Sequence, residues 1–410
     1  MKTRRIEKIN LLSATPGVET YLTVVRYGGH NEGRSGAQTN TQENTQDNRQ
    51  RPPKVYLQAG LHADEWPGIL ALNHLQILLD AADAKGNIVG EIVLLPYANP
   101  MGMAQFLKGY HIGRFDFDMT GNFNRDYVDL ANWAVDEVSL QLTENKLDNQ
   151  QRIRKVFADK LNAYQPSLAI DYLKKQLLLL SFDSDYVLDL HCDTKSILHL
   201  YCNQRQQTQG ELLAACLDCD LVLLEDDPGC IGFDIAGAGA WWKLSDLLKQ
   251  RGIESPVGMP CFSSTVELRG QGDVDDVINA QDAANLYRYL VQIGVVQDED
   301  VGLIAAQTAS VPAQSISKLL TAVDTIIAPS AGLVVYKKAL GEAVKAGDVV
   351  AELIDITQPP SASPRIPLVA NADGIVFTQI TNNLVRPGHT VVKIVGDTPL
   401  TYRQGNLLAF

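Results

Sequence analysis

The chain has 410 residues, with 48 Asp or Glu against 35 Lys or Arg, so its formal net charge is -13 at pH 7. Because nucleic acids and anionic membranes attract positively charged surfaces, this balance argues against either as the main partner. With 45% hydrophobic residues the chain can bury a large core, and its length favours two domains. No apolar run approaches the length of a membrane span.

The start of the chain and its cysteines bear on the cellular compartment. Residues 1–12 are basic, but Glu, Lys and Asn interrupt their apolar residues, so we expect no export signal. Six cysteines in a chain of this length are then expected to be reduced thiols in the cytoplasm. Residues 30–53 contain almost no apolar side chains and predict a flexible polar insertion.

The pattern of apolar residues after this insertion alternates between strand and helix periodicity. A helix is expected over residues 66–81, and residues 129–180 are expected to be mainly helical. Strands are expected at residues 55–59, 91–97, 187–190, 197–202, 221–224 and 265–268. This alternation predicts an α/β domain over residues 1–300, with a mixed, mostly parallel sheet flanked by helices.

After residue 303 the chain shows short β-rich runs broken by Pro and Gly. Residues 328–335 (APSAGLVV) are similar to residues 370–377 (ANADGIVF), and each copy continues to a second glycine and paired valines. We therefore expect a linker over residues 301–325 and a small all-β domain over residues 326–410. The repeat resembles the biotinyl/lipoyl-like fold, but its hairpin tip at residues 353–358 lacks the lysine that carrier members modify.

A metal-ligand pattern follows the first expected strand of the α/β domain. His62 and Glu65 are three residues apart, just before a helix that Pro67 opens, and His191 ends another apolar run. Two imidazoles and one carboxylate bind Zn²⁺ and leave a fourth position for water, which is typical of a catalytic site. Asp189 and Asp193 lie close enough to orient an imidazole. The alternatives are a solvated surface pair and a structural core histidine.

Further polar residues indicate hydrolytic chemistry. Glu267 ends an apolar strand, where a carboxylate is costly without a role or a partner, and it is our candidate general base. The alternative is an ion pair with Arg269 or another cation. Arg125 offers a planar fork suited to a carboxylate, with Asn124 beside it, although both can also belong to an ordinary surface loop.

Taken in order, these positions resemble the zinc carboxypeptidase superfamily, and within it the succinylglutamate desuccinylase/aspartoacylase branch, over about residues 50–290. The positions that carry the resemblance are His62-x-x-Glu65, Asn99-Pro100-x-Gly102, Asn124-Arg125, His191 and Glu267. The terminal β domain also fits this branch.

The resemblance implies a role for each of these residues. It implies one Zn²⁺ per chain, held by His62, Glu65 and His191, with Glu267 as the base. It further implies that Asn124 and Arg125 hold a substrate carboxylate. An arginine should also polarise the scissile carbonyl, for which Arg114 is our candidate and Lys108 and Arg125 are the alternatives.

The function expected on this basis is that of a zinc-dependent hydrolase that cleaves the amide bond of an N-acyl amino acid or a similar small substrate. One alternative is a metallocarboxypeptidase that acts on peptides. Another, of a different class, is a non-catalytic metal-containing protein for binding or assembly. The expected partner is a small molecule with a carboxylate, with no nucleic acid or membrane, and homo-oligomerisation is left open.

Overall fold

The computed structural model describes most of the chain. The described residues are 3–13, 15–29, 51–117, 121–226, 231–254, 256–302, 316–359, 361, 365–405 and 407. The predicted polar insertion lies outside them except for residues 51–53, and so do residues 303–315 of the predicted linker. No helix of the described residues is long and apolar enough to cross a membrane.

The first part of the chain alternates strands and helices. Its strands are β1 (Arg5–Asn10), β2 (Tyr21–Gly28), β3 (Lys54–Ala59), β4 (Glu91–Leu95), the short β5 (Phe106–Leu107), β6 (Tyr110–His111), β7 (Phe115–Asp116) and β8 (Gly121–Asn122), then β9 (Tyr186–Asp193), β10 (His199–Asn203), β11 (Val222–Glu225), β12 (Phe262–Gly270) and β13 (Ser317–Leu319). Its helices are α1 (Pro67–Lys85), α2 (Pro100–Met103), α3 (Leu130–Ser139), α4 (Lys146–Ala163), α5 (Ala169–Ser181), η1 (Gln204–Gln206), α6 (Gln207–Leu217), η2 (Ile235–Gly239), α7 (Ala240–Gln250) and α8 (Asp276–Gln292).

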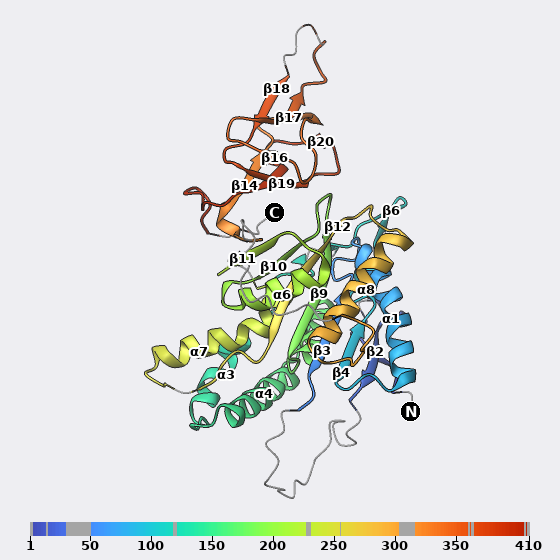
Figure 1. The fold of residues 1–410 in the computed structure, drawn as a ribbon, viewed down its shortest axis with the longest axis vertical. Coiled ribbons are helices and arrows are strands. Elements are labelled where there is room, and N and C mark those ends of the chain that lie inside the picture. The colour runs from blue at the N-terminus through green and yellow to red at the C-terminus, as the bar shows by residue number, and fades with distance from the viewer. Residues whose placement is uncertain are drawn as a thin grey trace, which may run out of the picture.

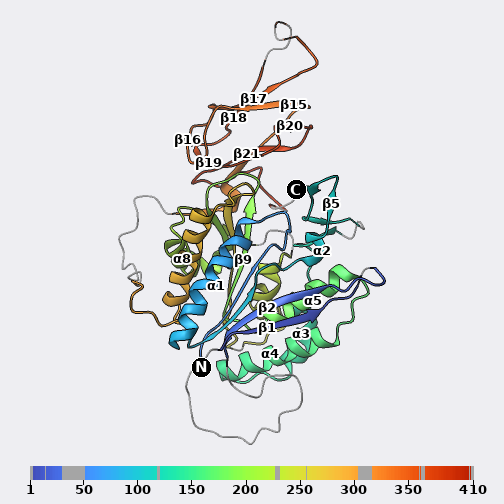
Figure 2. The same ribbon diagram turned by 90° about the vertical axis from the view of Figure 1, so that its right-hand side faces the viewer.

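One nine-stranded sheet organises this part, in the order β1-β2-β4-β3-β9-β12-β10-β11-β13. The pairs from β4 through β3 and β9 to β12 are parallel, whereas β10 runs antiparallel to β12. Helices α1, α6 and α8 cover one face, and α3, α4, α5 and α7 cover the other, each through its own apolar core (Figure 1; α5 is labelled in Figure 2). The mixed, mostly parallel α/β architecture predicted from the sequence is confirmed.

The predicted elements differ from the observed ones mainly at their ends. β9 continues two residues beyond His191, because β12 pairs with it as far as Asp193. The strand expected at residues 91–97 ends at Leu95, and the helix expected at residues 66–81 continues to Lys85. The long helical stretch divides into three helices, with breaks before Lys146 and Ala169.

The C-terminal part contains two four-stranded antiparallel sheets (Figure 2). Its strands are β14 (Val323–Ile327), β15 (Gly332–Tyr336), β16 (Ala343–Val344), β17 (Val349–Ile354), β18 (Ile366–Val369), β19 (Gly374–Gln379), β20 (Leu384–Val385) and β21 (Thr390–Val395), and η3 (Leu320–Ala322) precedes them. The two copies of the sequence repeat provide β15 and β19, which lie in different sheets. Valines and leucines of both sheets form one core between them.

The C-terminal part packs directly on the nine-stranded sheet. Ser317–Leu319, within the predicted linker, adds β13 to the edge of that sheet beside β11. Phe377 and Val395 of the C-terminal strands share a buried apolar cluster with Tyr201 and Leu223. The backbone of Phe377 also accepts a hydrogen bond from Ile197 at 3.0 Å. The two parts are therefore joined by packing as well as by the chain.

Candidate active site

The loop between β3 and α1 carries the first two candidate ligands. Gly60 follows the strand with a φ of +66°, a conformation that glycine adopts without strain. The Glu65 amide donates to the His62 carbonyl at 3.1 Å, which closes a turn and brings the two side chains to one side. Helix α1 then begins at Pro67, as predicted, because proline at this position loses no helical hydrogen bond.

The Asn99-Pro100-x-Gly102 motif holds this loop in place. The buried Asn99 amide donates to the Leu61 carbonyl at 2.9 Å, and its oxygen accepts from the Gly102 amide at 2.8 Å. A Cβ on Gly102 would meet the Asn99 side chain at 2.5 Å. These residues therefore fix the backbone that presents His62.

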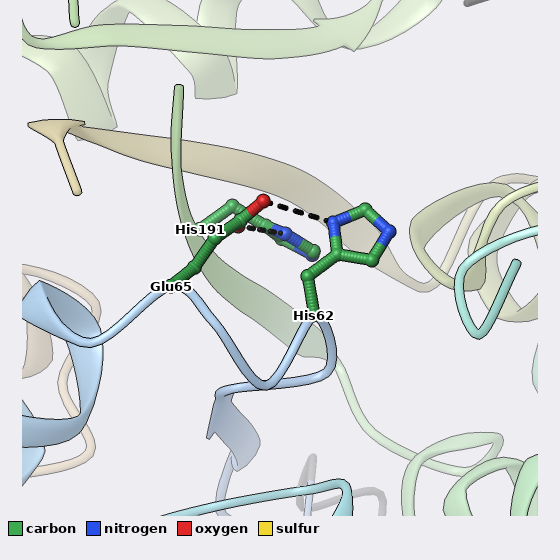
Figure 3. A group of neighbouring side chains, drawn as sticks. All are labelled: His62, Glu65 and His191. Carbon is green, nitrogen blue, oxygen red and sulfur yellow. Dashed lines mark hydrogen bonds and ion pairs between the residues drawn. The ribbon is translucent and has the colours of Figure 1, made fainter. Parts of the chain in front are cut away.

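The structure brings the three predicted ligands together, although they come from two separate elements (Figure 3). His62 Nδ1 lies 3.0 Å from Glu65 Oε1, and His191 Nδ1, on β9, lies 2.7 Å from Glu65 Oε2. All three residues are buried, and their candidate ligand atoms lie within 4.8 Å of one another. Two imidazole nitrogens and a carboxylate oxygen suit Zn²⁺. The donor set fits the predicted metal.

The Nε2 atom of each imidazole also has a polar partner. His191 Nε2 lies 2.9 Å from Asp189 Oδ2, and His62 Nε2 lies 2.8 Å from Asn122 Oδ1. Such partners fix the ring orientation and leave Nδ1 facing the shared centre. Asp189 thus occupies the orienting position considered for it, whereas Asp193 instead pairs with Lys393 at 3.1 Å.

Burial and close charges shift the pKa values in this cluster. Burial lowers the pKa of His62 to about 4, and the nearby Arg114 acts in the same direction. Burial would raise the pKa of Glu65, but His62 and His191 outweigh it and hold that pKa well below its usual range. For His191 burial is outweighed by the carboxylates of Asp189 and Glu65, which raise its pKa.

Glu267 projects from β12 beside the candidate metal-ligand cluster. It pairs in register with His191 of the neighbouring strand, so the two side chains share a face of the sheet. It lines the same pocket as both histidines, and its buried Oε2 has no hydrogen-bond partner among the described residues. Burial, with Glu65 adding to it, raises the pKa of Glu267 to about 8. A metal ion nearby would favour the charged form and lower this pKa.

The three cationic candidates for the scissile carbonyl occupy different positions. Arg114 and Arg125 line the pocket, and Arg114 Nη2 donates to Glu65 Oε1 at 2.8 Å. Lys108 is exposed at the turn between β5 and β6 and does not line this pocket. The geometry therefore favours the two arginines.

Asn124 is placed at the pocket, but its side chain already has protein partners. Its Oδ1 accepts from the Phe233 amide at 2.8 Å, and its Nδ2 lies 3.3 Å from His191 Nε2. Arg125 Nη1 donates to the Asn124 carbonyl at 2.7 Å. Asn124 is thus positioned to support His191 and the pocket wall, beside the guanidinium that we expect to hold a carboxylate.

Several residues at the site could not be found from the sequence. Asn122 contacts His62 from a short strand, Lys393 lines the pocket from the C-terminal part, and Tyr201 and Asp234 also line the pocket. Asn122, at a Gly-Asn step two residues before Asn124, had a weak local signal. Lys393 had none, because its position depends on how the two parts of the chain pack.

Comparison with known proteins agrees with this geometry. Residues 51–229 match the family model described as the succinylglutamate desuccinylase/aspartoacylase catalytic domain. This segment belongs to that family. It carries the three candidate ligands, while Glu267 lies beyond its end. No curated protein sequence matches the chain significantly.

Solved structures show the same fold over nearly the whole chain. A candidate succinylglutamate desuccinylase/aspartoacylase from Shewanella frigidimarina is 24% identical with a TM-score of 0.76, covering 96% of this chain and 98% of its own. A candidate family member from Shewanella amazonensis is 24% identical with a TM-score of 0.77, covering 95% and 98%. The product-bound ectoine utilization protein EutE (DoeB) from Ruegeria pomeroyi is 15% identical with a TM-score of 0.59, covering 97% and 96%. The fold of both parts of the chain is therefore shared with solved proteins.

Proposed function

We propose that this succinylglutamate desuccinylase/aspartoacylase family protein is a zinc-dependent hydrolase that cleaves the amide bond of an N-acyl amino acid or a similar small substrate. The observation that carries the proposal is the convergence of His62, Glu65 and His191, with both outer imidazole nitrogens held and Glu267 in the same pocket. Family membership supports amide hydrolysis as the reaction class. We further propose that the C-terminal sheets have the biotinyl/lipoyl-like fold without a carrier role.

Different residues of the pocket would bind the metal and transfer the proton during hydrolysis. His62, Glu65 and His191 would hold the metal, which when bound supplies a Lewis acid that makes an attacking water easier to deprotonate. Glu267 would take the proton of this water and later deliver it to the leaving amine. Its buried, unpartnered oxygen is suited to this exchange, because no protein donor competes for it in the described structure.

The two arginines would bind and polarise the substrate. Arg125 offers a planar fork for a carboxylate at the pocket wall. Arg114, 2.8 Å from a carboxylate oxygen of Glu65, lies where it can stabilise negative charge that develops on the scissile carbonyl. Asn124 holds the wall between them and His191.

The first test of the proposal is metal content together with turnover. We expect about one zinc per chain, in keeping with a single three-ligand catalytic site, and chelator-sensitive hydrolysis of an N-acyl amino acid panel. Glu267→Gln should keep the zinc and lower kcat by at least about 100-fold, because general acid–base catalysis contributes that much. Unchanged turnover in this variant would rule out the assigned base, and faster cleavage of peptides than of N-acyl amino acids would favour a carboxypeptidase.

A further inference from the structure

One buried histidine next to the candidate base has no part in the proposed mechanism. His199 is the first residue of β10 and is fully buried. It pairs in register with Glu267 on β12, which pairs in turn with His191 on β9. Residues directly opposite each other on paired strands point to the same face of the sheet. Glu267 therefore lies between two histidines, one inside the candidate metal-ligand cluster and one outside it.

The ring of His199 is fixed by its neighbours. Its Nδ1 lies 2.9 Å from the Ile197 carbonyl oxygen, which can only accept, so Nδ1 carries the ring hydrogen. The ring also meets Tyr201 of the same strand and Phe377 of the C-terminal part edge to face, with both pairs of ring centroids 5.3 Å apart. Contacts from both parts of the chain thus set the orientation of this imidazole.

The other ring nitrogen of His199 is a hydrogen-bond acceptor without a protein partner. Burial lowers the pKa of His199 to about 4, so the ring is neutral at neutral pH and Nε2 carries a lone pair. Nε2 is buried and has no hydrogen-bond partner among the described residues. A buried acceptor that stays unpaired is costly. This cost indicates that Nε2 meets a donor at some stage of the protein's activity.

Glu267 is the neighbour that can become this donor. Its Oε2 is likewise buried without a partner in the described part of the chain. The Asp193 carboxylate acts on the pKa of both Glu267 and His199, so both side chains lie near it. Directly opposite residues have Cβ atoms about 4.5–5.5 Å apart, within reach of two long side chains. Two acceptors cannot bond to each other, but a carboxyl that has taken a proton has an O–H to donate.

We infer that His199 is a positioning residue for Glu267, and that its Nε2 accepts a hydrogen bond from the Glu267 carboxyl while that group holds the proton of the attacking water. This inference rests on the proposed function and deepens it. One O–H bond of the water breaks and one forms on Glu267, the proton then passes to the leaving amine, and His199 gains none. Because the hydrogen bond forms only as the proton is transferred, it stabilises the transition state more than the resting enzyme. Through Phe377, the C-terminal part contributes to this positioning.

Two amide variants separate this role from a structural one. His199→Asn keeps a donor near the position of Nδ1 but has no acceptor at the position of Nε2, whereas His199→Gln has an acceptor near Nε2 and loses the donor to Ile197. For the best substrate of an N-acyl amino acid panel, His199→Asn should lower kcat about tenfold, as loss of one hydrogen bond does. KM and zinc content should be unchanged. His199→Gln should keep kcat within about threefold of the unmodified protein.

A purely structural role predicts the opposite order of the two variants. If His199 only supports the fold through its bond to Ile197, His199→Asn should be both more stable to urea and more active than His199→Gln. That order of activity, or equal kcat in the two variants, would overturn the inference. His389→Asn and His389→Gln are the matched controls, because His389 is exposed and does not line the pocket. Both should leave kcat and stability unchanged.

A second measurement needs no turnover and so separates this inference from the proposed function. Glu267→Gln places an amide N–H where the protonated base would have its O–H. With ¹⁵N-labelled histidine in the zinc-loaded protein, the Nε2 signal of His199 should move upfield in Glu267→Gln, because an unprotonated ring nitrogen is shielded when it accepts a hydrogen bond. The chain has seven histidines, and His199→Gln identifies the signal.

The signal of the exposed His389 is the internal control and should not move. An unchanged His199 signal would overturn the inference even in an active hydrolase. A shifted signal without hydrolysis of any N-acyl amino acid would support the contact between the two side chains and reject the hydrolase.

Discussion

The two ring nitrogens of His191 contact different carboxylates, so the two nitrogens have different roles. Nδ1 faces Glu65 and the shared centre, whereas Nε2 lies 2.9 Å from Asp189. Gln58 in turn donates to the other oxygen of Asp189 at 2.9 Å, so this carboxylate is itself held in place. The chain of contacts orients the imidazole before any metal binds.

Asp189→Asn should therefore weaken zinc binding without removing a ligand. The amide keeps the size of the carboxylate but loses its charge, and loss of such an orienting partner costs about 10–100-fold in metal affinity. Competition with a chromophoric chelator measures this change. The exposed Asp159 on α4 provides the control Asp159→Asn, which should bind zinc normally. Equal affinity in both variants would mean that Asp189 has only a packing role.

At the same scale, the sequence predicts the residues whose neighbours in the chain reveal their chemistry. The spacing of His62 and Glu65 predicts these two residues, and their positions on apolar strands predict His191 and Glu267. Asn122, Tyr201 and Lys393 could not be predicted, because Asn122 meets His62, and Tyr201 and Lys393 line the pocket, only through contacts between distant segments. Strand pairing and domain packing supply that information.

At the scale of elements, the loop that carries His62 and Glu65 packs closely against the segment that contains Gly113. The Ala63 amide donates to the Gly113 carbonyl at 3.0 Å. A Cβ on Gly113 would lie 2.6 Å from the Ala63 Cβ and 2.8 Å from the Asp64 nitrogen, both closer than real contacts. The loop between the two ligands is thus packed against backbone that cannot take a side chain.

Gly113→Ala should displace this loop and lower zinc content, with a loss of about 1–3 kcal/mol in the free energy of unfolding, as overpacking usually costs. Metal analysis and urea unfolding measure the two effects. Gly272 is the matched control, because a Cβ there would meet nothing within 4 Å. Full zinc occupancy in Gly113→Ala would show that the loop accommodates the methyl group without moving its ligands.

Element types were predictable from periodicity, but their ends and partners were not. The pattern of apolar residues predicts a strand that ends at Leu190, whereas pairing with β12 extends β9 to Asp193. That extension carries Asp193 toward the C-terminal part, where it meets Lys393. The position of β13 at the far edge of the sheet likewise follows from packing and has no local pattern.

At the scale of the whole molecule, the Asp193–Lys393 ion pair joins the two parts of the chain at the pocket. The side chains are only 18% and 10% exposed, so both charges are largely removed from water. Asp193 Oδ1 also accepts from the Thr194 amide at 2.7 Å. The Lys393 side chain comes from β21, next to the apolar cluster around Phe377. The C-terminal part therefore contributes to the lining of the pocket.

Lys393→Met should destabilise the protein by about 3 kcal/mol, because it leaves a largely buried carboxylate without its partner. Asp193→Asn together with Lys393→Met should recover much of this loss, since neither charge then remains. Urea unfolding of the two single variants and the double variant measures the coupling. Lys345→Met, at an exposed site of the same domain, is the control.

If the single and double variants are equally stable, the pair does not hold the two parts together. If the double variant is stable but has a higher KM, Lys393 acts on the substrate as well as on Asp193.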